Sequence, residues 1–296
     1  MRCLTVRHVS TYSYDEPVRF GEHRMMFRPR ASHDLRMIRA GLDIQPQPMD
    51  LRWLHDVLDN SVAIATFNTP AAQLRFESVV TIEHIETPMP DYVLEAGARA
   101  FPFVYSDDER PDLVSALARQ YPSDDLAAWT ARFLGSGAGT TMGLLLSMTQ
   151  GIHDEFKYLR RTEKGVQSPG ETLRRRCGSC RDFAVLMIEA VRSLGVAARF
   201  VSGYIFTPDA GQASAVGGGA THAWMQAYLP GAGWVDFDPT NSIVGNRNLI
   251  RVAVAWDHHN ALPLWGTFVG PPSAFRGLDV AVSVVEEPKD EAEPFL

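Results

Sequence analysis

The first third of the chain alternates apolar and polar residues in short runs, such as residues 4–9 and 79–85. This period of two is typical of strands that bury one face. Turn-forming residues separate the runs, as at residues 15–17 and 29–32, with the spacing of a sandwich. We therefore predict a β-rich N-terminal domain over residues 1–90, folded as an antiparallel β-sandwich.

The pattern changes at residues 86–91, where two prolines break the alternation and indicate a linker. Apolar residues then recur at helical spacing over residues 110–158. Ser123 precedes two aspartates and is a candidate cap for one of these helices. We predict a helical connecting region over residues 91–145.

A further helix is predicted from Cys180 to Leu194, because its apolar residues form a stripe and Gly195 is a common helix-ending residue. The strand period then returns in four segments, at residues 198–206, 221–229, 234–237 and 249–256. A helix that leads into a sheet is typical of an α+β fold. We predict the fold class α+β, with this core over residues 146–285 and an acidic tail over residues 286–296.

Composition and charge exclude several classes of protein. Of the 296 residues, 45% are hydrophobic and 21% are charged, as in ordinary globular proteins. The net charge of -7 at pH 7 disfavours nucleic-acid binding, which needs a concentrated basic surface. Apolar runs fall short of the roughly 20 residues of a membrane-spanning helix, and the start is too charged for a secretory signal. We predict a cytoplasmic protein without nucleic-acid or membrane partners, whose oligomeric state the sequence leaves open.

Cys180 is the candidate nucleophile. It begins the predicted helix, where partial positive charge and unpaired backbone N–H groups favour a thiolate. The alternative is a small buried hydrophobe, as free cysteines often are. Cys177 and Cys180 also form a Cys-x-x-Cys pair, which occurs in redox and zinc sites. Zinc would need a second pair of ligands, and a redox motif would follow the first strand of a compact βα unit.

A thiolate nucleophile needs a base and a group that orients the base. His222 begins a predicted strand, and Asp236 and Asp238 lie on its predicted hairpin partner. If the turn has an odd number of residues, so that Tyr228 opposes Trp234, Asp238 lies diagonal to His222 and within reach of it. A turn with an even number of residues would instead place His222 and Asp238 on opposite faces. Parity alone does not separate Asp236 from Asp238.

The residues around these positions resemble the bacterial transglutaminase-like superfamily. The resemblance rests on four segments: Gly178–Ala184, Ala198–Tyr204, His222–Trp224 and Trp234–Thr240. It implies a papain-like core, in which the nucleophile helix packs on an antiparallel sheet, joined to a β-rich N-terminal region. It also implies that Cys180 is the nucleophile, His222 the base and Asp238 the orienting residue. The sequence departs from the pattern at Val185, where many relatives have histidine, and at Gln226, where many have glutamate.

The implied reaction is acyl transfer on amide bonds of a peptide or protein substrate through a thioester. The first hypothesis is hydrolysis of peptide or isopeptide bonds, as in a cysteine protease or amidase. The second is a protein-glutamine gamma-glutamyltransferase that forms cross-links, and the third is a noncatalytic peptide-binding module. The backbone N–H of Cys180 is the expected oxyanion donor, whereas no side chain can be assigned to that role. We expect no metal and no cofactor, because the chain lacks a calcium-binding loop of the Asp-x-Asp-x-Asp-Gly type. The segment 211–221 is either a gate or an ordinary surface loop.

Overall fold

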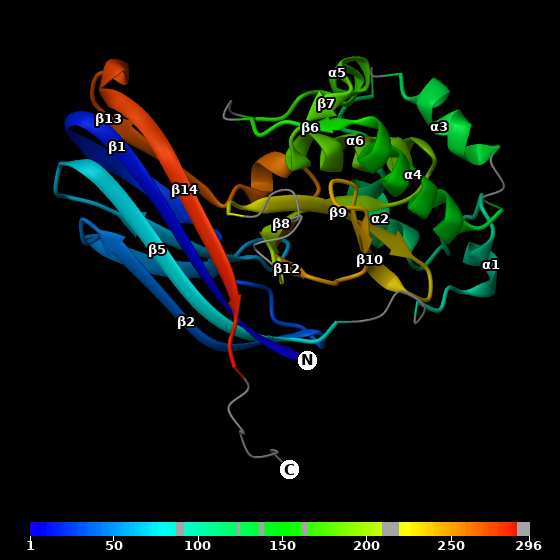
Figure 1. Cartoon of the computed structure of the whole chain (residues 1–296), viewed down its shortest axis with the longest axis horizontal. Coiled ribbons are helices and arrows are strands. Elements are labelled where there is room, and N and C mark those ends of the chain that lie inside the picture. Colours follow the sequence, from blue (N-terminus) through cyan, green and yellow to red (C-terminus); the bar gives the residue numbers. More distant parts are fainter. Residues whose placement is uncertain (87–91, 123–124, 136–138, 162–164, 209–218, 289–296) are drawn as a thin grey trace, which may run out of the picture.

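The protein is described here as a computed structural model, which covers residues 1–86, 92–122, 125–135, 139–161, 165–208 and 219–288 (Figure 1). Four sequence predictions fall wholly or largely outside these ranges. They are the linker at 86–91, the cap Ser123, the loop at 211–221 and the acidic tail at 286–296. Within the described ranges, no helix combines the length and the apolar character that crossing a bilayer requires.

The N-terminal sheet is built around one long strand, β1 (Arg2–Met25). Its first half pairs with β5 and β14, and its second half pairs with β4 and β13. The other strands are β2 (Leu35–Gln45), β3 (Asp50–His55), β4 (Ser61–Thr66), β5 (Ala71–His84), β13 (Leu264–Val269) and β14 (Phe275–Glu286). All pairings are antiparallel, in the order β2-β5-β1-β4-β3. An antiparallel N-terminal sheet is therefore confirmed.

Two strands of this sheet come from the far end of the chain. We predicted residues 264–285 as part of the core and residue 286 as the start of the tail, whereas β13 and β14 pair with β1 (Figure 1). The prediction was wrong for these residues because alternation shows that a strand has two unlike faces, but does not identify its partner. Leu4 opposes Glu286 across more than 280 positions of sequence, so no local signal marks the pairing.

The α-helices lie together, in the part of the fold away from the N-terminal sheet (Figure 1). They are α1 (Ala96–Arg99), α2 (Arg110–Leu117), α3 (Ala127–Leu134), α4 (Thr141–Glu155), α5 (Pro169–Arg175) and α6 (Cys180–Ser193). Of two short 3-10 helices, η2 (His258–Ala261) and η3 (Pro272–Ala274), the second connects β13 to β14 and contacts β1. The predicted helix at Cys180 is α6, and it ends one residue before the position expected. Thr140 caps α4 by accepting a hydrogen bond from the backbone N–H of Gly143.

The core sheet is antiparallel, with the order β11-β10-β9-β8-β12. Its strands are β8 (Ala198–Ile205), β9 (His222–Leu229), β10 (Gly233–Asp238), β11 (Ile243–Val244) and β12 (Leu249–Ala255). Helix α6 packs on one face of this sheet, where Phe183, Leu186 and Met187 share a buried cluster with Ala223 and Met225. Burying one such large side chain contributes about 1.5–3 kcal/mol. This packing fixes the N-terminus of α6 relative to β9.

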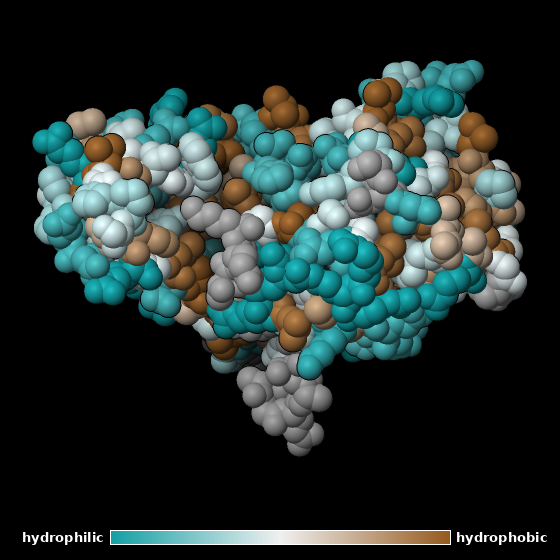
Figure 2. Space-filling view, turned by 90° about the horizontal axis from the view of Figure 1, so that it is seen from above, coloured by the Kyte–Doolittle hydropathy of each residue, from teal (hydrophilic) through white to brown (hydrophobic). Residues whose placement is uncertain are grey.

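The N-terminal sheet packs against the core sheet. Their shared cluster contains Leu4, Val6, Leu35, Val80 and Ile82 from the first and Tyr204, Phe206, Ile250 and Val252 from the second. On the face seen from above, Figure 2 shows hydrophilic and hydrophobic residues interspersed over both parts, as is usual for protein surfaces. The apolar interface therefore joins the two parts of the fold.

Candidate active site

Cys180 occupies the first turn of α6, as predicted, and its residue is only 7% exposed. The preceding residues form β7 (Cys177–Gly178), which pairs in parallel with β6 (Lys157–Tyr158). Gly178 is required here, because a Cβ at this position would lie 2.9 Å from the Cβ of Asp182. The chain therefore enters α6 through a tight turn that only glycine fits.

Asp182 holds this turn in place. Its carboxylate accepts hydrogen bonds from the backbone N–H and the hydroxyl of Ser179, both at 2.8 Å, and from the backbone N–H of Gln167 at 2.7 Å. Arg161 pairs with it at 2.7 Å. Burial raises the pKa of Asp182, but these partners outweigh burial and hold the pKa below its usual value. The sequence analysis did not identify Asp182 as the anchor, although an acidic residue three positions after Ser179 is the signature of a capping box.

His222 and Asp238 meet across the hairpin of β9 and β10. Tyr228 opposes Trp234, so the turn is the odd one of the two cases that the sequence left open. The Nε2 atom of His222 lies 2.8 Å from Oδ2 of Asp238, and both side chains are fully buried. Asn241 and the backbone N–H of Thr240 also donate to Asp238, at 2.8 and 2.9 Å.

The charges of this pair are strongly coupled. Burial alone would lower the pKa of His222, but the Asp238 carboxylate and the nearby Cys180 raise it well above its ordinary value. Burial likewise opposes ionisation of Asp238, yet His222, Asn241 and Thr240 hold the pKa of Asp238 below its ordinary value. The pair therefore favours an imidazolium beside a carboxylate.

The second ring nitrogen of His222, Nδ1, is not used by the bond to Asp238. An ionised Asp238 only accepts hydrogen bonds, so Nε2 of His222 carries a proton. Its Nδ1 atom is buried and makes no hydrogen bond to any described residue, while Cys180 lies near enough to raise the pKa of the ring. Nδ1 is thus the atom that can take a proton from, or hold one beside, the Cys180 sulfur.

Asp236 has a different set of partners. Its Oδ1 accepts a hydrogen bond from the indole Nε1 of Trp224 at 2.6 Å, and its Oδ2 pairs with Arg251 at 3.1 Å. The geometry therefore separates the two aspartates that parity left equivalent, because the described contacts connect only Asp238 with His222.

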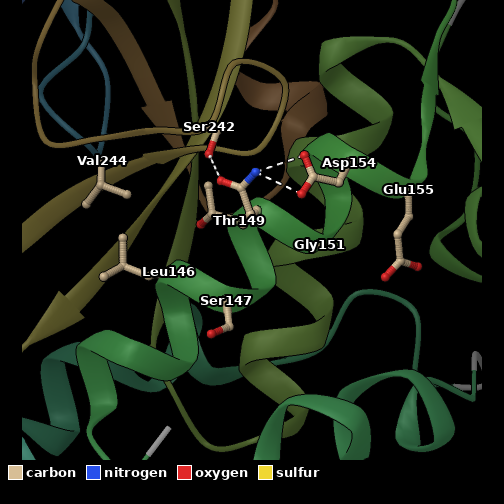
Figure 3. Close-up of a pocket in the computed structure, with 9 residues that line it drawn as sticks. Leu146, Ser147, Thr149, Gly151, Asp154, Glu155, Ser242 and Val244 are labelled. Carbon is tan, nitrogen blue, oxygen red and sulfur yellow. Dashed lines mark hydrogen bonds between the residues drawn. The ribbon is translucent and has the colours of Figure 1, made fainter. Parts of the chain in front are cut away.

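Helix α4 supports the turn that follows Asp238. Nδ1 of His153 lies 2.9 Å from the carbonyl oxygen of Thr240, and the Ser242 hydroxyl donates to Gln150 at 2.7 Å. A cavity of about 440 Å³ lies beside these contacts, lined by Leu146, Ser147, Thr149, Gln150, Gly151, Asp154, Glu155, Ser242 and Val244 (Figure 3). Its lining includes Ser242 and Val244, which follow Asp238, but not Cys180. The cavity therefore lies next to the turn after Asp238, and the thiol is not in it. Sequence reasoning missed these supports because they come from a helix more than 80 residues upstream.

Tyr158 also lies near Cys180. Burial and the neighbouring Cys180 raise the pKa of Tyr158 to about 12, so its hydroxyl stays protonated. Parallel pairing of β6 with β7 places Tyr158 opposite Gly178. The sequence analysis did not single out this residue, because two-residue strands leave no periodic signal.

The two departures from the expected sequence pattern have structural partners. Val185 is buried in the apolar cluster around α6. Gln226 accepts a hydrogen bond from Arg199 at 2.9 Å, and the Arg199 guanidinium lies 4.1 Å from the centroid of the Trp234 ring. The contacts of His222 described above involve neither Val185 nor Gln226.

Cys177 and Cys180 carry free thiols, as does Cys3. Among the described residues, a group that brings potential metal ligands together is Asp257, His258 and His259. Both imidazole Nδ1 atoms contact Oδ1 of Asp257, at 3.2 and 2.8 Å, while the buried Nε2 atom of His258 has no hydrogen-bond partner among the described residues. The group contains no cysteine, and the Cys-x-x-Cys pair therefore does not form part of it.

Comparisons with known proteins agree with the fold. Residues 128–239 match the transglutaminase-like superfamily, and residues 4–83 match the bacterial transglutaminase-like N-terminal region. An uncharacterized protein of Mycobacterium leprae is 36% identical over 284 residues, covering 95% of this chain and 98% of the relative. An uncharacterized protein of Mycobacterium tuberculosis is 28% identical over 295 residues, covering 95% and 91%.

A solved structure has the same overall architecture. The crystal structure of a "putative cysteine protease" from Cytophaga hutchinsonii superposes with a TM-score of 0.72 at 20% identity, covering 100% of this chain and 93% of the other. The likeness confirms the α+β fold, with an antiparallel N-terminal sheet followed by a papain-like core. The chain belongs to the transglutaminase-like superfamily and carries the bacterial transglutaminase-like N-terminal region.

Proposed function

We propose that this protein is a thiol-dependent acyltransferase that cleaves amide bonds through Cys180, His222 and Asp238. The observation that carries the proposal is the buried bond between His222 and Asp238, which leaves Nδ1 of His222 available beside a cysteine at a helix N-terminus. This is the arrangement that an activated thiol nucleophile needs. Membership of the transglutaminase-like superfamily supports the same chemistry.

In the first half of the reaction, the Cys180 thiolate attacks the carbonyl carbon of the amide and forms a tetrahedral intermediate. The C–N bond then breaks, and His222 delivers its Nδ1 proton to the departing nitrogen. The products are a free amine and a thioester on Cys180. Asp238 remains ionised throughout and keeps the ring oriented, because its pKa is held below its ordinary value.

In the second half, neutral His222 takes a proton from the acceptor as the acceptor attacks the thioester, and the thiolate leaves. Water as acceptor releases a carboxylic acid, whereas an amine forms a new amide. The backbone N–H of Cys180 is free to stabilise the oxyanion, since the first N–H groups of a helix have no acceptor within it. Hydrolysis of peptide or isopeptide bonds is the proposed reaction.

A single assay separates the candidate functions. Casein incubated with the protein and a fluorescent primary amine reports hydrolysis as new N-termini and transfer as incorporated fluorescence. We expect new N-termini, loss of activity in Cys180→Ala and retention of activity in the matched control Cys177→Ala. Fluorescence without cleavage would instead favour the gamma-glutamyltransferase. Binding of casein that is unchanged by Cys180→Ala, with neither product, would favour the binding module.

A further inference from the structure

A buried chain of charged groups links the N-terminal sheet to the core sheet. Arg251 of β12 lies between two carboxylates, with Nη2 at 2.6 Å from Oδ1 of Asp34 and Nη1 at 3.1 Å from Oδ2 of Asp236. The Arg251 side chain is 14% exposed, and those of Asp34 and Asp236 are 7% and 2% exposed. The Ser32 hydroxyl also accepts from Nη2 of Arg251, at 3.2 Å. Since Ser32 and Asp34 both precede β2, the N-terminal region holds one side of the Arg251 guanidinium, and Asp34 supplies its charged partner there.

The chain continues to the imidazole of His222. Asp236 accepts the indole hydrogen bond of Trp224 at 2.6 Å, and the Trp224 ring stacks on the His222 ring with centroids 5.8 Å apart and planes inclined by 27°. Trp224 is fully buried. It reaches across β8 only because Gly203 has no side chain, as a Cβ there would lie 2.7 Å from the indole ring.

We infer that Asp34 and Arg251 are positioning residues for His222, acting through Asp236 and Trp224. The inference rests on the proposed function, in which His222 is the base. It also assigns a role to the N-terminal region, which supplies the outermost carboxylate of the chain.

The physical argument concerns what happens when the outermost group is lost. Arg251 bridges Asp34 and Asp236, and a planar guanidinium can hold two carboxylates in fixed directions. Without Asp34, the guanidinium keeps only the neutral Ser32 hydroxyl on that side, so the direction in which Asp236 accepts the indole bond is less restricted. The Trp224 ring then gains freedom beside His222, and small displacements of a catalytic group cause large losses of rate.

The same interface offers a matched control. Tyr204 of β8 contacts Nδ1 of His8 in β1 at 2.9 Å, and both residues are buried. The Tyr204 hydroxyl also donates to the carbonyl oxygen of Phe27, at 3.4 Å. Tyr204→Phe therefore removes two buried polar contacts between the same two parts of the fold. Neither His8 nor Tyr204 is bonded to the chain of Asp34, Arg251, Asp236 and Trp224.

The experiment compares wild type, Asp34→Asn, Arg251→Lys and Tyr204→Phe by two measurements. The first is the rate at which iodoacetamide alkylates Cys180 at pH 7, followed by peptide mass spectrometry. The second is the position of the Trp224 indole N–H resonance and of the His222 ring resonances in selectively labelled protein. We expect Asp34→Asn and Arg251→Lys to slow alkylation at least about tenfold and to move these resonances. Tyr204→Phe should leave both unchanged.

Several outcomes overturn the inference. Wild-type rates and resonances in folded Asp34→Asn would do so. An equal effect of Tyr204→Phe would also do so, because it would indicate a general response to a weakened interface. If both chain variants fail to fold at 10 °C while Tyr204→Phe folds, the groups are structural rather than positioning. If His222→Ala does not slow wild-type alkylation, the proposed function fails, whereas shifted Trp224 and His222 resonances in Asp34→Asn would still report the coupling.

Discussion

Replacing Asp182 with asparagine should destabilise the fold by about 3 kcal/mol. The carboxylate is fully buried and accepts hydrogen bonds at both oxygens. In asparagine, one oxygen can still accept from Arg161 and Gln167, but the amide nitrogen would face the backbone N–H of Ser179, which is itself a donor. The Ser179 N–H would lose its partner, which costs about 1–3 kcal/mol, and Arg161 would lose an ionised partner.

The assay is urea unfolding at pH 7 and at lower pH, followed by circular dichroism. The folded-state pKa of Asp182 lies below its unfolded value, which is about 3.9 for aspartate. Its ionisation therefore stabilises the fold above that pH, and the contribution is lost as the pH falls through the folded-state pKa. The difference between wild type and Asp182→Asn should be full at pH 7 and should shrink on acidification.

Asp154→Asn is the matched control, because Asp154 is exposed and accepts hydrogen bonds from Gln150 on the same helix. Its effect should stay within about 0.5 kcal/mol. The reasoning is refuted if Asp182→Asn unfolds at the wild-type urea concentration, or if its deficit is the same at every pH.

Three further predictions follow from the same geometry. Asp238→Asn should slow amide cleavage, measured as kcat/KM, by at least about 100-fold. Asp236→Asn should slow it less, because of the two aspartates only Asp238 contacts His222. A larger loss in Asp236→Asn than in Asp238→Asn would refute this assignment. The His222 ring should titrate in NMR spectra above its ordinary pKa of about 6.5. Its protonation therefore stabilises the fold fully below about pH 6.5, and this contribution is lost as the pH rises through the raised folded-state pKa. A His222 titration below about pH 6 would contradict this prediction. Leu186→Ala should cost about 2–5 kcal/mol in urea unfolding, because the side chain is fully buried between α6 and the core sheet, and a loss under 1 kcal/mol would contradict that packing.

Sequence reasoning succeeded for features that depend on residues close together in the chain, such as the start of a helix or the face of a strand. A cysteine before an apolar stripe predicted the start of α6. Strand parity gave the consequence of each turn length, and the pairing of Tyr228 with Trp234 is the case that brings Asp238 within reach of His222. Parity could not separate Asp236 from Asp238, because residues two apart on a strand share a face. The resemblance chose Asp238, and the structure adds a physical reason, since Asp236 is held by Trp224 and Arg251.

The features that sequence reasoning missed depend on contacts between distant parts of the chain. Arg161 and Gln167 reach Asp182 from the segment before α5, and β14 returns to pair with β1. Asp34 reaches Arg251 across more than 200 residues. A single sequence records which face of an element is apolar, but not which distant polar group will meet it when the sheets pack.

The most direct test of the proposed chemistry compares two cysteines in the same protein. Cys177 is the more exposed thiol and Cys180 is buried, so accessibility alone predicts that iodoacetamide modifies Cys177 faster. Activation by His222 predicts the opposite, with Cys180 modified at least about tenfold faster at pH 7 and this advantage lost in His222→Ala. Faster modification of Cys177, with no change at Cys180 in His222→Ala, would contradict the account.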